Sequence, residues 1–289
     1  MKPLLRFADE QFDHWFTPVR MRQAELAVLR ISVFAFLAHI LIIFFGHLYD
    51  PVSVSPHHYL KAIFTPFSFI LYYEVFLLVV IIPKSISEFI GKQFEVITLI
   101  TLRSFFHDIA DIDFRLSISI THPEILGLLY DLVAALLMLV ITILYYKLYR
   151  KSEWSEPPKG LLDFISIKKL VSLAMIMILV TLSFISFYQW CLEMVNAFRA
   201  STPYPDPNRV FFADFFTIMI FVDVLLLIIS FMYHFTFFSV FRNASFVITT
   251  ILIRVSMGLD KPQNYFIILI GFLFSLLSYY LYRFRPKEK

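Results

Sequence analysis

Long apolar segments, separated by short polar ones, recur along the whole chain and restrict its fold more than any other feature. Hydrophobic residues make up 59% of the sequence, whereas charged residues make up only 16%. This balance is typical of transmembrane helices and not of a soluble domain with a single core. The sequence therefore predicts an all-α, polytopic integral membrane protein, whose immediate partner is the lipid bilayer.

Eight segments are predicted to cross the membrane. They are residues 28–48, 62–82, 94–109, 125–147, 170–194, 211–234, 244–259 and 264–283. Before the first of them, residues 3–16 alternate apolar and charged side chains at helical spacing, which predicts a short amphipathic helix in the membrane interface. Segments 94–109 and 244–259 would reach only about 24 Å, less than a hydrocarbon core of about 30 Å, so we expect neighbouring helices to surround them.

One ten-residue stretch occurs twice, as Phe94–Arg103 and as Ser245–Arg254, with Val, Ile, Thr, Ile and Arg at the same five positions. Other short correspondences follow in the same order along the two halves of the chain, which favours duplication over chance. We therefore predict two tandem, parallel four-helix repeats. Residues 1–148 form the first module with its interfacial helix, residues 149–168 a cytoplasmic linker, and residues 169–289 the second module.

The distribution of basic residues predicts the orientation, because cytoplasmic segments of membrane proteins are enriched in Lys and Arg. With eight spans and the N-terminus inside, eighteen of the 25 Lys and Arg fall in inner segments. These segments are residues 1–30, 83–93, 147–169, 236–243 and 283–289. A model with six spans and inverted halves would instead place the basic linker outside. We expect a multi-pass protein of the cell membrane with both termini in the cytoplasm.

Four charged residues are predicted to lie at similar depths inside the membrane. Glu74 and Asp223 belong to the second helix of each module, and Arg103 and Arg254 to the third. A charge at the centre of a membrane helix costs about 2.5–3.5 kcal/mol, so we expect the pairs Glu74–Arg103 and Asp223–Arg254. Two interpretations of these pairs are about equally favoured. They form a path for ions or protons, or they have a structural role and fix the packing of the helices. Asp131, in the outer part of its span, has no evident basic partner in the same helix.

A second group of candidate residues is a set of histidines at the predicted outer face of the first module. Together with nearby Asp and Glu, imidazole side chains at one face are able to bind Zn²⁺ or a related ion. No two of them have the spacing of a metal site on one helix, and loop polarity explains the same composition. The histidines are His47, His57, His58, His107 and His122.

Several functions are disfavoured by what the sequence lacks. The net charge of +3 is too small to indicate a nucleic-acid partner, and the single cysteine excludes an intramolecular disulfide. None of the six glycines forms a GxGxxG or GxxxxGK pattern, and GxSxG and HExxH motifs are absent, so an enzyme is not favoured. No cofactor is expected beyond a metal ion at the outer face.

Three hypotheses for function remain. The first is movement of a small ion, H⁺ or a monovalent cation, through or beside the intramembrane acid and arginine residues. The second is a non-catalytic membrane scaffold, acting as a homo-oligomer or as a subunit of a larger membrane complex. The third is a metal-dependent membrane enzyme that uses the outer histidines and carboxylates. The sequence does not identify the ion or the substrate.

Overall fold

The described part of the chain is helical throughout. The computed structural model describes residues 2–49, 57–111, 123–150, 161–200, 208–233 and 237–284. Their helices are α1 (Lys2–Trp15), α2 (Pro18–Tyr49), α3 (His57–Val80), α4 (Ile86–Asp111), α5 (Pro123–Arg150), α6 (Leu161–Ala200), α7 (Asn208–Tyr233), α8 (Phe237–Ser256) and α9 (Gln263–Arg283). The predicted fold class is confirmed in this respect, including the short helix at the start.

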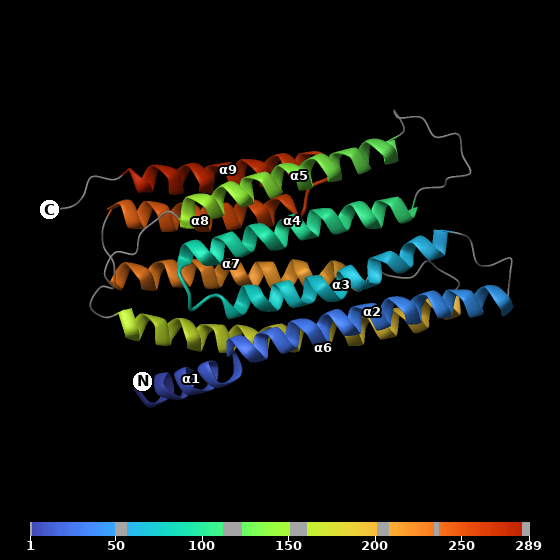
Figure 1. The fold of residues 1–289 in the computed structure, drawn as a ribbon, viewed down its shortest axis with the longest axis horizontal. Coiled ribbons are helices and arrows are strands. Elements are labelled where there is room, and N and C mark those ends of the chain that lie inside the picture. The colour runs from blue at the N-terminus through green and yellow to red at the C-terminus, as the bar shows by residue number, and fades with distance from the viewer. Residues whose placement is uncertain are drawn as a thin grey trace.

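The eight long helices lie side by side and successive helices run in opposite directions (Figure 1). Both ends of the chain lie at one end of this bundle, and so do the last turn of α5 and the first turn of α6. The two halves of the chain therefore begin and end on the same side. Which side of a membrane this end faces remains a prediction.

Among the described residues, six helices are long and apolar enough to cross a membrane, namely α2, α5, α6, α7, α8 and α9. In α3 only Thr65–Val80 is comparably apolar, and α4 includes several charged residues. The chain therefore has the features of a multi-pass integral membrane protein. The predicted count of eight spans and the predicted duplication both remain predictions.

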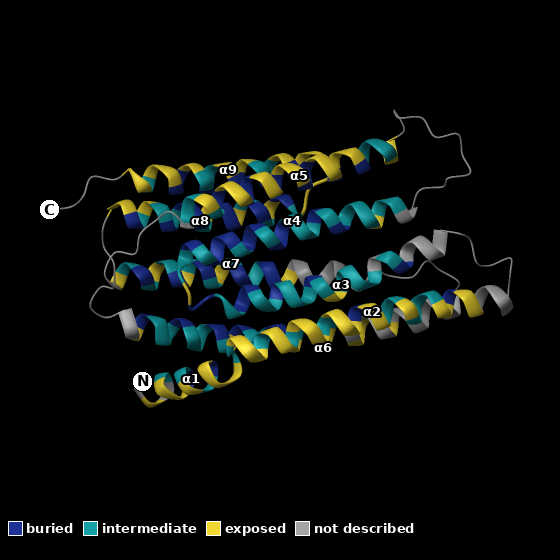
Figure 2. Cartoon of the chain, viewed as in Figure 1, coloured by how far each residue is buried: buried dark blue, intermediate teal, exposed yellow. Residues whose placement is uncertain are grey.

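The long helices differ strongly in burial (Figure 2). Most of α2 is exposed and apolar, as expected for a helix that faces lipid. By contrast, Phe89, Ile90, Phe94 and Ile97 of α4 are buried among neighbouring helices. Helix α4 is also longer than the predicted segment 94–109, because it starts at Ile86.

The early start of α4 places Lys92 and Gln93 inside a helix of the bundle and not in a cytoplasmic loop. Gly91 lies beside them, and a Cβ atom there would meet the ring of Tyr146 on α5 at 2.9 Å. A glycine at this position therefore permits the close approach of α4 and α5.

Each half of the chain packs as a series of neighbouring helices. Helices α2, α3, α4 and α5 contact one another in order, and α6, α7, α8 and α9 do the same. The halves meet where α5 packs on α9 and where α3 packs on α6. At the centre, the rings of Phe94 on α4 and Phe272 on α9 stack with their centroids 3.8 Å apart, and both are fully buried.

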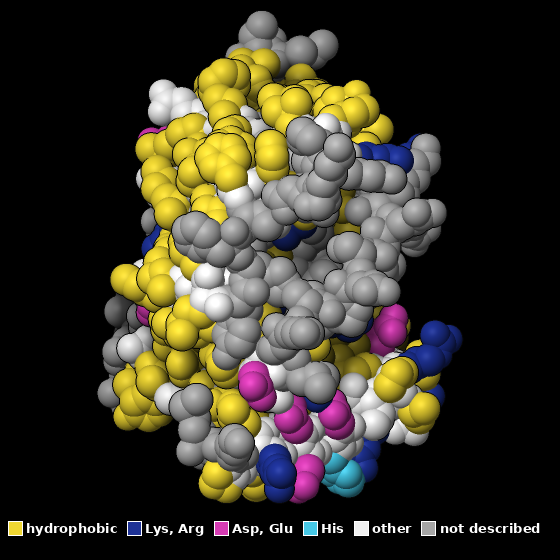
Figure 3. Space-filling view, turned by 90° about the vertical axis from the view of Figure 1, so that its left-hand side faces the viewer, with side chains coloured by type: hydrophobic (Ala, Val, Ile, Leu, Met, Phe, Trp, Pro, Cys, Tyr) yellow, Lys and Arg dark blue, Asp and Glu magenta, His cyan; other side chains and the backbone are white. Residues whose placement is uncertain are grey.

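Helix α1 packs against the first turns of α6. The ammonium of Lys169 pairs with Asp9 at 3.4 Å and with Asp13 at 2.8 Å, and the hydroxyl of Ser166 donates to Asp9. Ala8 and Phe12 of α1 are buried, whereas Trp15 is exposed. Figure 3 looks onto this end of the bundle, where acidic and basic side chains gather at the bottom of the view and hydrophobic ones cover the flank.

Candidate functional site

The two predicted charge pairs do not form. Glu74 pairs with Lys92. Asp223 accepts a hydrogen bond from the amide of Gln93 at 3.3 Å, and Arg254 donates to Thr217 at 2.9 Å. Arg103 is buried, as predicted, although not as the partner of Glu74. The pairing was wrong because equal depth along neighbouring helices does not determine which side chains face one another.

The Glu74–Lys92 pair lies in the hairpin of α3 and α4. Glu74 is six residues before Val80 at the end of α3, and Lys92 is six residues after Ile86 at the start of α4, so both lie about 9 Å from their helix ends. Lys92 also pairs with Glu95 at 2.7 Å. These charges are closer to the end of the bundle than the predicted mid-membrane position of Glu74.

Removal of Lys92 is expected to destabilise the bundle more than removal of the whole pair. The change Lys92→Met leaves Glu74 and Glu95 without their cation and should cost about 2 kcal/mol, less than for a fully buried ion pair because these side chains are partly exposed. Adding Glu74→Gln should recover more than half of this loss, because one stranded charge is then removed. Thermal unfolding in detergent measures both variants. A double variant no more stable than Lys92→Met would contradict this account.

Asp223 is a buried carboxylate for which the described part of the chain provides no paired cation. It is 6% exposed and lies ten residues before Tyr233, or about 15 Å from the end of α7. Within the described residues its side chain forms no ion pair, and its contacts are with neutral groups. Gln93, which donates to it, accepts in turn from the hydroxyl of Thr250 on α8 at 2.9 Å. Three helices, α4, α7 and α8, thus meet at one carboxylate through hydrogen bonds from neutral side chains.

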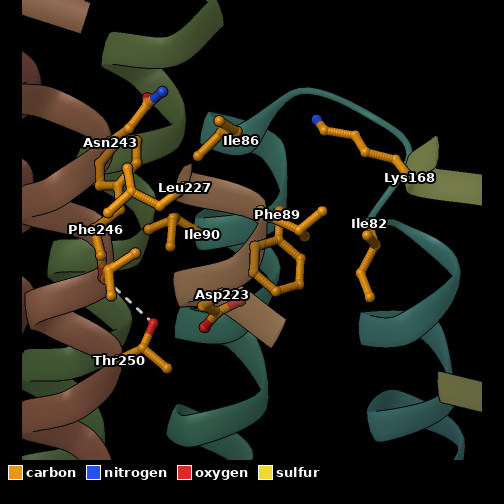
Figure 4. A pocket seen from close by; sticks show the side chains of 12 residues that line it. Ile82, Ile86, Phe89, Ile90, Lys168, Asp223, Leu227, Asn243, Phe246 and Thr250 are labelled. Atoms are coloured by element: carbon orange, nitrogen blue, oxygen red, sulfur yellow. Dashed lines mark hydrogen bonds between the residues drawn. The ribbon is translucent and has the colours of Figure 1, made fainter. Parts of the chain in front are cut away.

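A small cavity of about 30 Å³ adjoins Asp223, which is room for one or two water molecules. Its remaining polar lining comes from Lys168, Asn243 and Thr250, and the rest is apolar. Figure 4 shows Asn243 and Lys168 towards one end of this cavity and Asp223 and Thr250 towards the other. The ammonium of Lys168 is buried and donates to the backbone carbonyl of Lys84 at 2.9 Å. A buried cation at the α3–α4 turn thus lines the same cavity as Asp223, with apolar side chains such as Phe89 and Ile82 between them.

Asp131 of α5 forms a second polar site, distant from the first. Its side chain is 0% exposed, and one carboxylate oxygen lies 2.7 Å from the ammonium of Lys261 in the α8–α9 turn. The hydroxyl of Tyr265 on α9 also donates to Asp131. The partner that Asp131 lacks on its own helix thus comes from the other half of the chain.

The histidine hypothesis falls mainly outside the described side chains. His122 lies outside the described residues, and the side chains of His47, His57 and His58 are likewise not described. His107 is exposed, with its Nδ1 atom 3.4 Å from Asp108. Among the described residues, no group of three His, Cys, Asp or Glu side chains is arranged to hold a metal ion. A metal site remains a prediction.

Sequence reasoning missed Lys92, Gln93 and Lys261 as members of these sites. The only sequence signal for Lys92 and Gln93 was that they adjoin the repeated stretch, and their polarity led to their assignment to a cytoplasmic segment. Lys261 lies next to Pro262 in a segment that looked like an exposed turn. Only the positions of the helix ends and the neighbouring helices bring these residues to the carboxylates.

The fold and these sites define the class of the protein as a multi-pass helical membrane protein with buried carboxylates at two levels. Its comparison with known proteins adds no closer relationship. No family model, curated protein or solved structure matches the chain.

Proposed function

We propose that the protein moves H⁺ or a monovalent cation across the cell membrane by way of Asp223. The observation that supports this proposal is a buried carboxylate that has hydrogen-bond partners but no cationic partner among the described residues. Ionisable groups in membrane segments are costly and are commonly found on ion or proton pathways. Glu74 shows the structural alternative in the same chain, because Lys92 neutralises it.

The predicted duplication adds a second argument. At the offset that aligns Phe94–Arg103 with Ser245–Arg254, Lys92 corresponds to Asn243. The second module therefore keeps an acid, Asp223, in its second helix. At the position of Lys92, which neutralises the acid of the first module, it has the neutral Asn243. If the acids served only to hold helices together, both copies would need the cation. A neutral Asn243 leaves the Asp223 carboxylate free to exchange a proton or a cation.

A second candidate function is a non-catalytic membrane subunit that assembles with partners through its helices. It is favoured by the tight packing of α4, α8 and α9, where Phe94, Ile97, Ile253 and Phe272 are all buried. The stack of Phe94 on Phe272 joins α4 to α9, so an ion path between these two helices would require them to separate. The subunit hypothesis requires no such movement.

Flux from liposomes distinguishes the two hypotheses. The purified full-length protein is reconstituted with pH-sensitive and cation-sensitive dyes inside the vesicles, and a pH gradient or a voltage is applied. We expect flux above that of protein-free vesicles for H⁺, Na⁺ or K⁺. A folded protein without flux under either gradient would exclude the transport hypothesis and favour the subunit.

A further inference from the structure

Lys261, in the α8–α9 turn, occupies a cage of oxygen atoms on the side of the bundle away from the chain termini. Its ammonium lies 2.7 Å from Asp108, 2.7 and 2.9 Å from the two carboxylate oxygens of Asp131, and 2.9 Å from the hydroxyl of Ser104. These side chains come from α4 and α5, which belong to the first half of the chain, whereas Lys261 belongs to the second. Such oxygen-rich surroundings are typical of sites for hard metal cations.

The cage has access to a larger space. A cavity of about 320 Å³ is lined by Asp108, Glu124, Tyr130 and Lys261, together with Pro123 and Gly127. The α8–α9 turn lies well short of the ends that α4 and α5 reach (Figure 1). The cavity therefore lies above the turn that carries Lys261, between the protruding ends of α4 and α5.

The charges around Lys261 do not balance within the cage. Asp108 and Asp131 together carry two negative charges against the one permanent positive charge of Lys261, and the exposed His107 beside Asp108 adds a second only when it is protonated. Burial would lower the pKa of Lys261, but its hydrogen bonds to Asp108 and Asp131 raise the pKa above its ordinary value. The lysine therefore remains a cation, on a flexible side chain that is able to turn towards the cavity.

We propose that this cage is a binding site for a monovalent metal cation, such as Na⁺ or K⁺, and that Lys261 is a tethered competitor for it. An incoming cation replaces the ammonium charge for charge between Asp108, Asp131 and Ser104. The displaced ammonium then lies in the adjacent cavity. The site is separate from Asp223, and its existence does not depend on the proposed transport function.

The charge-neutralising variant Lys261→Gln tests this site by direct binding. Isothermal titration of the full-length protein in lipid nanodiscs with NaCl or KCl, at constant ionic strength with choline chloride, measures the affinity. Lys261→Gln should bind Na⁺ or K⁺ at least about tenfold more tightly than the unmodified protein. The reason is that no ammonium then competes for the site, so every protein molecule is able to bind the cation. Lys261→Arg, which keeps the competing charge, should show no such gain.

Two further variants locate the binding, and a measurement on the unmodified protein covers the case in which Lys261→Gln does not fold. Adding Asp131→Asn to Lys261→Gln should abolish the gain, whereas Glu74→Gln, at a carboxylate that already pairs with Lys92, should leave binding unchanged. If Lys261→Gln does not fold, the unmodified protein provides the test: its thermal unfolding midpoint should rise with added NaCl or KCl but not with choline chloride. The proposal would be overturned if a folded Lys261→Gln bound neither cation, or if choline chloride gave the same binding heats as NaCl and KCl. It would also be overturned if the gain in affinity survived Asp131→Asn.

Discussion

Replacement of Asp223 by Asn is expected to reduce ion flux at least about tenfold while the protein remains folded. Asparagine has nearly the same volume and keeps an oxygen that accepts from Gln93. It loses the negative charge and the ability to take up and release a proton. Because no cation neutralises Asp223 in the described part of the chain, the variant also strands no opposite charge. Flux from liposomes and thermal unfolding in detergent together measure the two effects.

The matched control is Glu74→Gln at the corresponding position of the first module. Lys92 keeps Glu95 as its partner in this variant, so the hairpin of α3 and α4 should remain folded. We expect its flux to stay within about twofold of the unmodified protein, because a neutralised acid is not part of the proposed path. Equal losses in the two variants would instead indicate a general effect on packing. Full flux in Asp223→Asn would exclude Asp223 from the path.

Truncation of Phe272 to Ala should cause the largest loss of stability of any single change considered for the bundle. Its ring is fully buried and stacks on Phe94, so it joins the two halves of the chain at their centre. Removing a buried Phe side chain typically costs about 3–5 kcal/mol through lost contacts and the cavity left behind. In a membrane this packing is the main attraction between helices, because lipid is as apolar as the side chains.

Phe266→Ala on the same helix provides the control for this prediction. Phe266 is 68% exposed and faces outward, so its truncation should change stability by less than about 0.5 kcal/mol. Titration with a denaturing detergent compares the two variants under identical conditions. Similar unfolding midpoints for both would show that the stack of Phe94 and Phe272 does not hold the halves together.

The sequence by itself determined the elements of this protein. Apolar runs long enough for a bilayer predicted the long helices, and the mixed pattern of residues 3–16 predicted α1. Composition is sufficient at this level, because every backbone polar group in a membrane must be satisfied within its own helix. The start of α4 was predicted eight residues late, since Lys92 looked too polar for a buried helix.

The tertiary structure alone decided the partners of the buried charges. Gln93 lies 130 residues before Asp223, and Asp131 lies 130 residues before Lys261, so no local spacing relates them. Each pair forms because two helices from different halves of the chain pack with particular faces together. Apolar residues cover several faces of every membrane helix, and hydropathy therefore determines that a segment crosses the membrane but not which neighbour it meets.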